Sequence, residues 1–171
     1  MKNSGIVRAF ASITVVGVIG AVNAPGVLAA TATANLAVSA TVTNNCTIST
    51  AALAFGTYDP VVANTSANLD GTGRVTVACT KGSTATIGLG TGSNGSGAAR
   101  RMSDGSGNYL SYELYSDSGR AAVWNTGSGL LSPTAATSKT ARDFTVYGRV
   151  SGNQDVPSGA YSDTVVATVN F

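Results

Sequence analysis

The 171-residue sequence contains no histidine, and only 11% of its residues are charged. Without histidine the chain has no Ser-His-Asp triad, no Cys-His pair and no histidine-ligated metal. It also lacks the G-x-S-x-G and S-x-x-K motifs of serine enzymes. Its eight acidic residues are scattered, mostly beside turns, where such side chains commonly close on their own backbone. We therefore expect no enzyme, no cofactor and no metal site, with a paired-carboxylate glycosidase as the remaining catalytic alternative.

Long apolar runs are also scarce, and the longest is at the N-terminus. Lys2 and Arg8 precede an uncharged run at 10–22, and small residues follow at Ala29 and Ala30. The run is too short to span a membrane and is typical of a secretory signal peptide. We predict a signal peptide at residues 1–30, with cleavage after position 29 or 32 nearly as favourable and a membrane anchor as the alternative. No membrane span is expected in the mature chain.

Loss of this leader removes two of the ten basic residues and none of the eight acidic ones. The mature chain then has eight charges of each sign and a net charge near zero. Without a basic patch, nucleic acid and anionic lipid are not expected partners. The low charge content suits a protein whose surface is largely covered by neighbours.

Only two cysteines are present, Cys46 and Cys79. Secretion places them in an oxidising compartment, so a disulfide between them is expected. Two free buried thiols are the alternative. A zinc site would need more ligands than two cysteines provide.

What the sequence does have is alternation of apolar and polar residues, interrupted by glycine-rich turns. This period of two marks half-buried strands, and no segment shows the periodicity of an amphipathic helix. Behind the leader and an N-terminal arm we predict six strands, near residues 46–55, 73–80, 84–90, 109–116, 142–150 and 161–171. Short strands, turns and a disulfide predict an all-β antiparallel sandwich, and a complete constant-type immunoglobulin sandwich has seven strands.

The arm at residues 31–43 shows the same alternation directly behind the leader. Its apolar face consists of Leu36, Val38, Ala40 and Val42. Such a segment is either the first strand of a self-sufficient sandwich or a strand that completes the sheet of another molecule. The periodicity does not distinguish the two.

Four other features carry weaker signals. Residues 90–95 match G-x-G-x-x-G, but no βαβ unit surrounds them, so we expect a long, flexible loop at 88–97. Asn45, Asn64 and Asn94 begin N-glycosylation sequons, a pattern that often occurs by chance. Trp124 is expected to be partly buried in the core. Tyr58, Tyr147 and Tyr161 belong either to the core or to a groove.

An ordered set of short segments carries a family resemblance across essentially the whole mature chain. The segments are NCTI at 45–48, FGTYDP at 55–60, GRVTVAC at 73–79, RM at 101–102, LSYELY at 110–115, VW at 123–124, VYGR at 146–149 and YSDTV at 161–165, ending at Phe171. The set resembles the spore coat protein U domain family. It is also similar to the major subunits of Csu-type archaic chaperone–usher pili.

The resemblance implies an incomplete immunoglobulin-like sandwich, residues 45–171, completed by a strand from a chaperone or a neighbouring subunit. It implies that residues 31–44 are a donor-strand arm and that Leu36, Val38, Ala40 and Val42 insert into the neighbour. The C-terminal strand would line the acceptor groove with Val165, Ala167, Val169 and Phe171.

On this reading the protein is a structural pilus subunit, which passes through the periplasm to the cell surface and supports attachment and biofilm formation. Its implied partners are a periplasmic chaperone, an outer-membrane usher and identical subunits in a homopolymer. The alternatives are a spore or cell-surface coat protein assembled by the same machinery, and a secreted carbohydrate-binding or hydrolytic β-sandwich.

Overall fold

The computed structural model describes residue 26 and residues 28–171. Most of the signal peptide predicted for residues 1–30 therefore lies outside the described residues. Within the described part, no helix has the length and apolar character needed to cross a membrane. All the strands of the described part lie in one compact unit, Ala40–Phe171.

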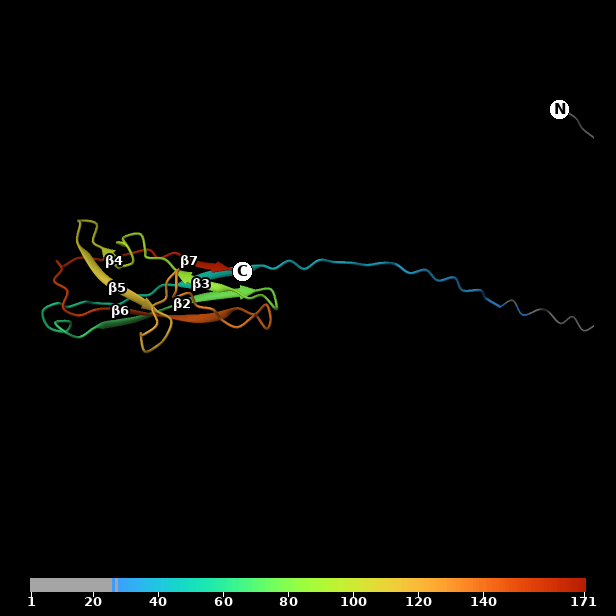
Figure 1. Cartoon of the computed structure of the whole chain (residues 1–171), viewed down its shortest axis with the longest axis horizontal. Helices are drawn as coiled ribbons and strands as arrows, with labels where there is room; N and C mark the ends of the chain where they lie inside the picture. The colour runs from blue at the N-terminus through green and yellow to red at the C-terminus, as the bar shows by residue number, and fades with distance from the viewer. Residues whose placement is uncertain (1–25, 27) are drawn as a thin grey trace, which may run out of the picture. The chain divides into compact units, whose positions relative to one another are not determined.

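Seven strands are formed by the described residues, and they belong to two antiparallel sheets (Figure 1). The larger sheet has the order β1-β2-β6-β5-β4, and the smaller sheet pairs β3 with β7. The bounds are β1 Cys46–Ala51, β2 Leu69–Cys79, β3 Thr86–Leu89, β4 Arg100–Ser103, β5 Tyr109–Tyr115, β6 Arg142–Val150 and β7 Ala167–Asn170. The predicted all-β antiparallel fold is confirmed.

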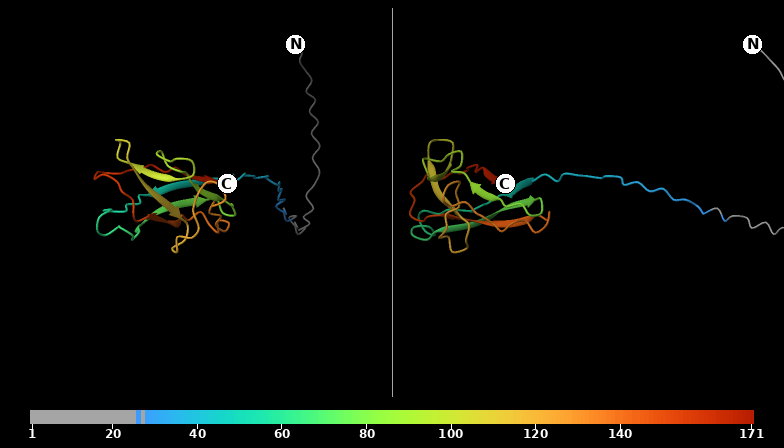
Figure 2. Two further views of the ribbon diagram at one scale, coloured as in Figure 1. Left: turned by 60° about the vertical axis from the view of Figure 1, so that its left-hand side comes forward. Right: turned by 45° about the vertical axis from the view of Figure 1, so that its right-hand side comes forward.

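Alternation of burial along β2, β5 and β6 explains how the two sheets enclose one core. On β2, for example, Val75 and Val77 are 1% exposed, while Arg74 and Thr76, which alternate with them, face outward. Ile87 of β3 and Trp124 are completely buried in the same cluster. Trp124 is thus more deeply buried than predicted, and its indole N–H donates to the Ile87 carbonyl. Figure 2 shows the strands from two further directions.

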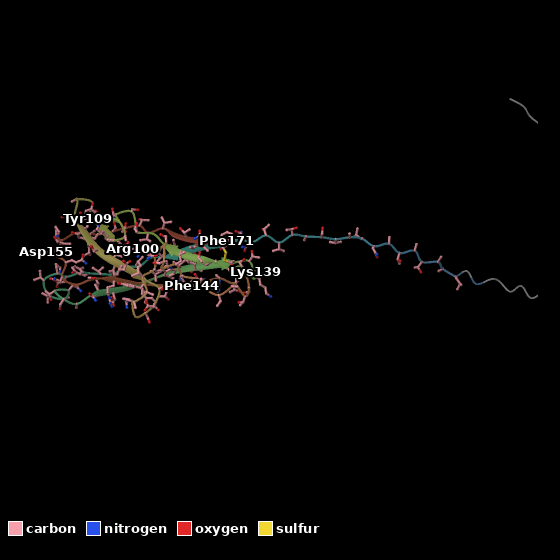
Figure 3. The ribbon with its side chains drawn as sticks, in the orientation of Figure 1. Arg100, Tyr109, Lys139, Phe144, Asp155 and Phe171 are labelled. Atoms are coloured by element: carbon pink, nitrogen blue, oxygen red, sulfur yellow. A yellow bond between two sulfur atoms is a disulfide. The ribbon has the colours of Figure 1, made fainter. Side chains whose placement is uncertain are left out.

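The predicted number of six strands is wrong, because β4 is a seventh strand in the described part. Arg100 begins this strand, and a charged residue at an inward position breaks the apolar alternation that marks a strand in sequence. The Arg100 side chain, which Figure 3 labels, is nevertheless buried. Its guanidinium donates to the carbonyls of Leu89, Gly90 and Trp124 and pairs with Glu113. These bonds compensate the loss of hydration, so the sheet tolerates the charge.

Four predicted strands are shorter in the structure, and two of them differ most. The strand expected at 46–55 ends at Ala51, and the one expected at 161–171 is paired as a strand only over Ala167–Asn170. Between 161 and 166 the chain makes an isolated bridge at Ser162 and bonds to Gly90 and Ser93 instead. Both shortened segments border the same opening in the core.

Residues 90–95 lie in the loop between β3 and β4, as predicted, and no helix follows them in the described chain. Several hydrogen bonds hold this loop to residues 162–164, including one from the Asn94 N–H to the Asp163 carboxylate. Asn64, from one of the three sequons, is only 5% exposed. Its side chain accepts from the Asp59 N–H and donates to the Ala67 carbonyl, so it closes a turn.

A disulfide joins Cys46 to Cys79, which are directly paired as the first residue of β1 and the last residue of β2. The next residue, Thr80, fastens the chain just before β1. Its N–H donates to the Asn45 carbonyl over 2.8 Å, and its hydroxyl oxygen accepts from the Asn45 N–H over 3.1 Å. We call residues 43–46 the arm root, because the predicted arm joins the domain there.

Candidate functional site

An open groove of about 1110 Å³ runs into the core of the sandwich. Protein interiors are packed as densely as organic crystals and contain few voids larger than a water molecule. The groove is far larger than such a void, so this part of the sandwich interior is open to solvent. Its floor is apolar and is formed by Leu69, Val75, Leu89, Met102, Leu110, Tyr112, Leu114, Val146 and Val150.

The first edge of the groove is the continuation of β1, residues 52–58. Leu53 and Phe55 point inward and are half-buried, while the residues between them are exposed. This segment forms no main-chain hydrogen bond with another segment of the described chain. It therefore has the alternation of a strand and free main-chain N–H and C=O groups.

The second edge is the segment that leads into β7, residues 163–167. The Gly90 N–H donates to the Val166 carbonyl over 2.9 Å, so the carbonyl of Val166 points toward β3. Ile87 of β3 instead bonds Leu131 through both its N–H and its C=O, so the main-chain groups of Ile87 point away from β7. In an antiparallel ladder the main-chain groups of successive residues point to opposite sides. The groups of Val165 and Ala167 consequently point away from β3, toward the open side of β7.

One polar contact crosses from the floor of the groove to its second edge. The Tyr112 hydroxyl of β5 donates to the Asp163 carboxylate over 2.7 Å. Burial, and then this hydrogen bond to a carboxylate, raise the pKa of Tyr112 above its ordinary value. The bond fixes the second edge relative to the larger sheet.

The three tyrosines whose place was open in sequence are now separated. Tyr58 and Tyr161 line the groove. The Tyr58 hydroxyl donates to the Ser151 carbonyl and accepts from the Gln154 N–H, which anchors the far end of the first edge. Tyr147 lies on the opposite face of β6, where the Arg120 guanidinium is 5.7 Å from its ring centre.

Of the four residues predicted to line the groove, two line it and two do not. Val165 and Ala167 line the groove, whereas Val169 packs against the core beyond it. Phe171 is 53% exposed and does not line it (Figure 3). Sequence analysis missed the whole floor and the first edge, although the alternation of Leu53 and Phe55 was a usable signal.

The predicted donor residues belong to no strand or helix in the structure. Leu36, Val38 and Val42 are 82–87% exposed, and Ala40 is exposed as well. An apolar face of this kind in water is unfavourable by about 25 cal/mol for each Å² of surface that a partner would cover. Whether the arm donates a strand is a prediction that these exposures do not test.

The acidic residues mostly have local structural partners. The pKa of Asp59 is lowered by the Val61 N–H, that of Asp104 by the Asn108 side chain, and that of Asp117 by the Ala122 N–H. Asp70 pairs with Arg149, which lowers the pKa of its carboxyl group. Across the described residues, no three His, Cys, Asp or Glu side chains gather as a metal site.

The groove, with its apolar floor and two edges, has a form suited to receiving an extended chain.

Comparison with known proteins agrees with this geometry. The family model described as Spore Coat Protein U domain matches residues 32–168. "Protein U" of Myxococcus xanthus is 47% identical over 156 residues, which cover 84% of this chain and 87% of that protein.

A solved structure is similar in fold, with a TM-score of 0.54 and 23% sequence identity. It is the CsuC–CsuE chaperone–tip adhesion subunit pre-assembly complex from the archaic chaperone–usher Csu pili of Acinetobacter baumannii. The match covers 77% of this chain and 40% of that chain.

Proposed function

This chain belongs to the spore coat protein U domain family, and from that premise we propose that it is a structural subunit that polymerises by donor-strand exchange. The observation that carries the proposal is the open groove, which has an apolar floor and an edge on each side with main-chain groups that bond no other described segment. A polypeptide that adds a strand there gains main-chain hydrogen bonds from the edges and a fit for its alternate side chains from the floor.

The arm has the composition that this groove requires. Residues 31–44 carry no charge, and only Arg74 and Asp163 are charged among the residues that line the groove. From Leu36 to Val42 an extended chain spans about 20 Å. The groove-lining stretch from Tyr161 to Ala167, which includes the second edge, has the same number of residues, so its length matches that of the arm's apolar face.

Insertion into another molecule would make a filament. Burying Leu36, Val38 and Val42 would contribute about 1.5–3 kcal/mol each, against the cost of ordering the arm. Because the arm and the groove are different surfaces, the contact is heterologous and repeats without closing. Surface attachment and biofilm formation are the proposed uses of such a filament.

A subunit with an open groove needs a cover before assembly, since an unpaired edge beside exposed core residues promotes aggregation. We propose a periplasmic chaperone as that cover and an outer-membrane usher as the site of exchange. The similar fold in a chaperone–subunit pre-assembly complex supports the chaperone. The product would then lie on the cell surface, and no enzymatic activity is proposed.

A second destination is favoured by the name of the curated relative. The chain is 47% identical to Protein U and matches a family model named for the spore coat. The same assembly would then build a coat on a spore or cell instead of a free pilus. Electron microscopy of surface material labelled with antibody to this chain distinguishes separate fibres from a continuous layer.

The test of strand donation uses the alternation of the arm. In secreted mature chain, Leu36→Asp and Val38→Asp would place a charge in an apolar groove and should abolish polymers in electron micrographs. Ala37→Asp and Ser39→Asp add the same charge on the other face of the strand and should leave polymers intact. Equal polymerisation of all four variants would exclude the arm as the inserting strand.

A further inference from the structure

The inner face of the larger sheet has a hollow where three side chains are missing. Gly71 and Gly73 lie at inward positions of β2, and Gly148 lies at an inward position of β6 directly opposite Gly71. None of the three has a positive φ, so backbone conformation does not require glycine there. A glycine within a strand often marks a place where another segment approaches closely.

Leu53 and Phe55 of the first groove edge occupy this hollow. A β-carbon at Gly148 would lie 2.8 Å from Leu53 Cδ1 and 2.8 Å from Phe55 Cε1 and Cζ. At Gly73 it would lie 2.9 Å from Leu53 Cβ, and at Gly71 it would lie 3.1 Å from Phe55 Cδ1. All three positions are therefore too close to these side chains for an alanine without a shift.

The hollow begins where β1 leaves its ladder. The last pair between β1 and β2 joins Ala51 to Arg74, and the next residue of β2 is Gly73. From there residues 52–55 cross over the inner face of the sheet and form no main-chain hydrogen bonds. Side-chain contacts with the glycines thus replace a ladder as the means of holding this edge.

We propose that Gly71, Gly73 and Gly148 are positioning residues for the incoming strand. By seating Leu53 and Phe55, they hold the first edge at the depth that leaves room for a strand, while its main-chain groups stay free to bond that strand. Phe55 also contacts Tyr112 of the floor, with ring centroids 6.0 Å apart. This role rests on the proposed function.

The experiment substitutes Gly148→Ala in the secreted mature chain. We expect the displaced side-chain ends of Leu53 and Phe55 to move away from the sheet, toward the groove. Binding of a fluorescent peptide with the sequence of residues 31–44 should then weaken about tenfold, and polymerisation should slow to match. Gly127→Ala is the control, because its β-carbon would meet only Asn125 Oδ1 at 3.5 Å and it lies outside the groove lining.

A compensating variant separates positioning from general destabilisation. Combining Gly148→Ala with Leu53→Val and Phe55→Leu removes the three atoms that the new methyl group meets. Peptide affinity should return to within about threefold of the wild-type value. Gly71→Ala, whose β-carbon would have longer contacts, should lose less peptide affinity. It replaces the Gly148 variant in the test if that variant does not fold.

The outcomes are distinct. Unchanged peptide affinity in Gly148→Ala would overturn the proposal that the glycines position Leu53 and Phe55. A loss of affinity that parallels a fall in melting temperature, and that the compensating changes do not restore, would overturn it as well. Failure of the wild-type chain to bind the peptide or to polymerise would instead overturn the proposed function.

Discussion

At the scale of single residues, Tyr112 connects the floor of the groove to its second edge. Its hydroxyl donates to Asp163, and burial together with this bond raises the pKa of Tyr112. In the unfolded chain a tyrosine titrates near pH 10. Because the folded state holds the proton more tightly, the stabilisation is fully present below about pH 10 and is lost as the pH rises above it.

We expect Tyr112→Phe to lower the free energy of unfolding by about 1–2 kcal/mol at neutral pH, since Asp163 loses a partner. The variant should also lose less stability than the wild type between about pH 9 and pH 11. Urea unfolding across this range measures both effects. Tyr147→Phe, on the outer face of β6, is the matched control and should change neither. Parallel alkaline curves for Tyr112→Phe and wild type would contradict the assignment.

At the scale of elements, β1 is an edge strand that pairs only with β2 and is mostly exposed. Its disulfide should therefore matter for stability. Replacing both Cys46 and Cys79 by alanine should lower the free energy of unfolding by about 2–5 kcal/mol. The melting temperature of the oxidised wild type against the double variant measures this, and reduced wild type should resemble the variant. Equal melting temperatures would show that the bridge adds no stability.

The strands with regular alternation were predictable from sequence, and β6 was predicted with its observed bounds. β4 was not predictable from sequence. Its buried Arg100 is stabilised by hydrogen bonds to the carbonyls of Leu89 and Trp124, and no local sequence pattern reveals these bonds. Residues 52–55 do alternate as a strand does. Whether such a segment joins a ladder depends on what lies beneath it, and here glycines of two other strands lie there.

The candidate site was predictable only in part for the same reason. The apolar face of the arm is local in sequence and was visible as a period of two. The groove floor collects residues from β2, β3, β4, β5 and β6, so it exists only once the chain has folded. Val169 and Phe171 continue the alternation of Val165 and Ala167, yet the groove lining ends at Ala167. The alternation of a strand does not show where a groove beside it ends.

At the scale of the whole molecule, assembly should depend little on salt. The arm is uncharged, the groove lining has one charge of each sign, and the chain without its leader is near neutral. Salt screens interactions between exposed charges and leaves apolar burial largely unaffected. Light scattering should give polymerisation rates that differ by less than about threefold between 50 and 500 mM NaCl. A rate that falls steeply with salt would indicate an electrostatic contact instead.

The disulfide at the arm root has a mechanical consequence in such a polymer. A subunit held by its own arm, as proposed, would take up tension at Asn45 and Cys46, which lie directly behind the arm. Because β1 is bound to β2 alone, a pull at its first residue would otherwise peel the ladder open, one residue pair after another. The covalent bond to Cys79 passes the load directly into β2, inside the sheet. The first edge of the groove would then be spared, and a stretched fibre of the proposed kind would keep its hold on the next subunit.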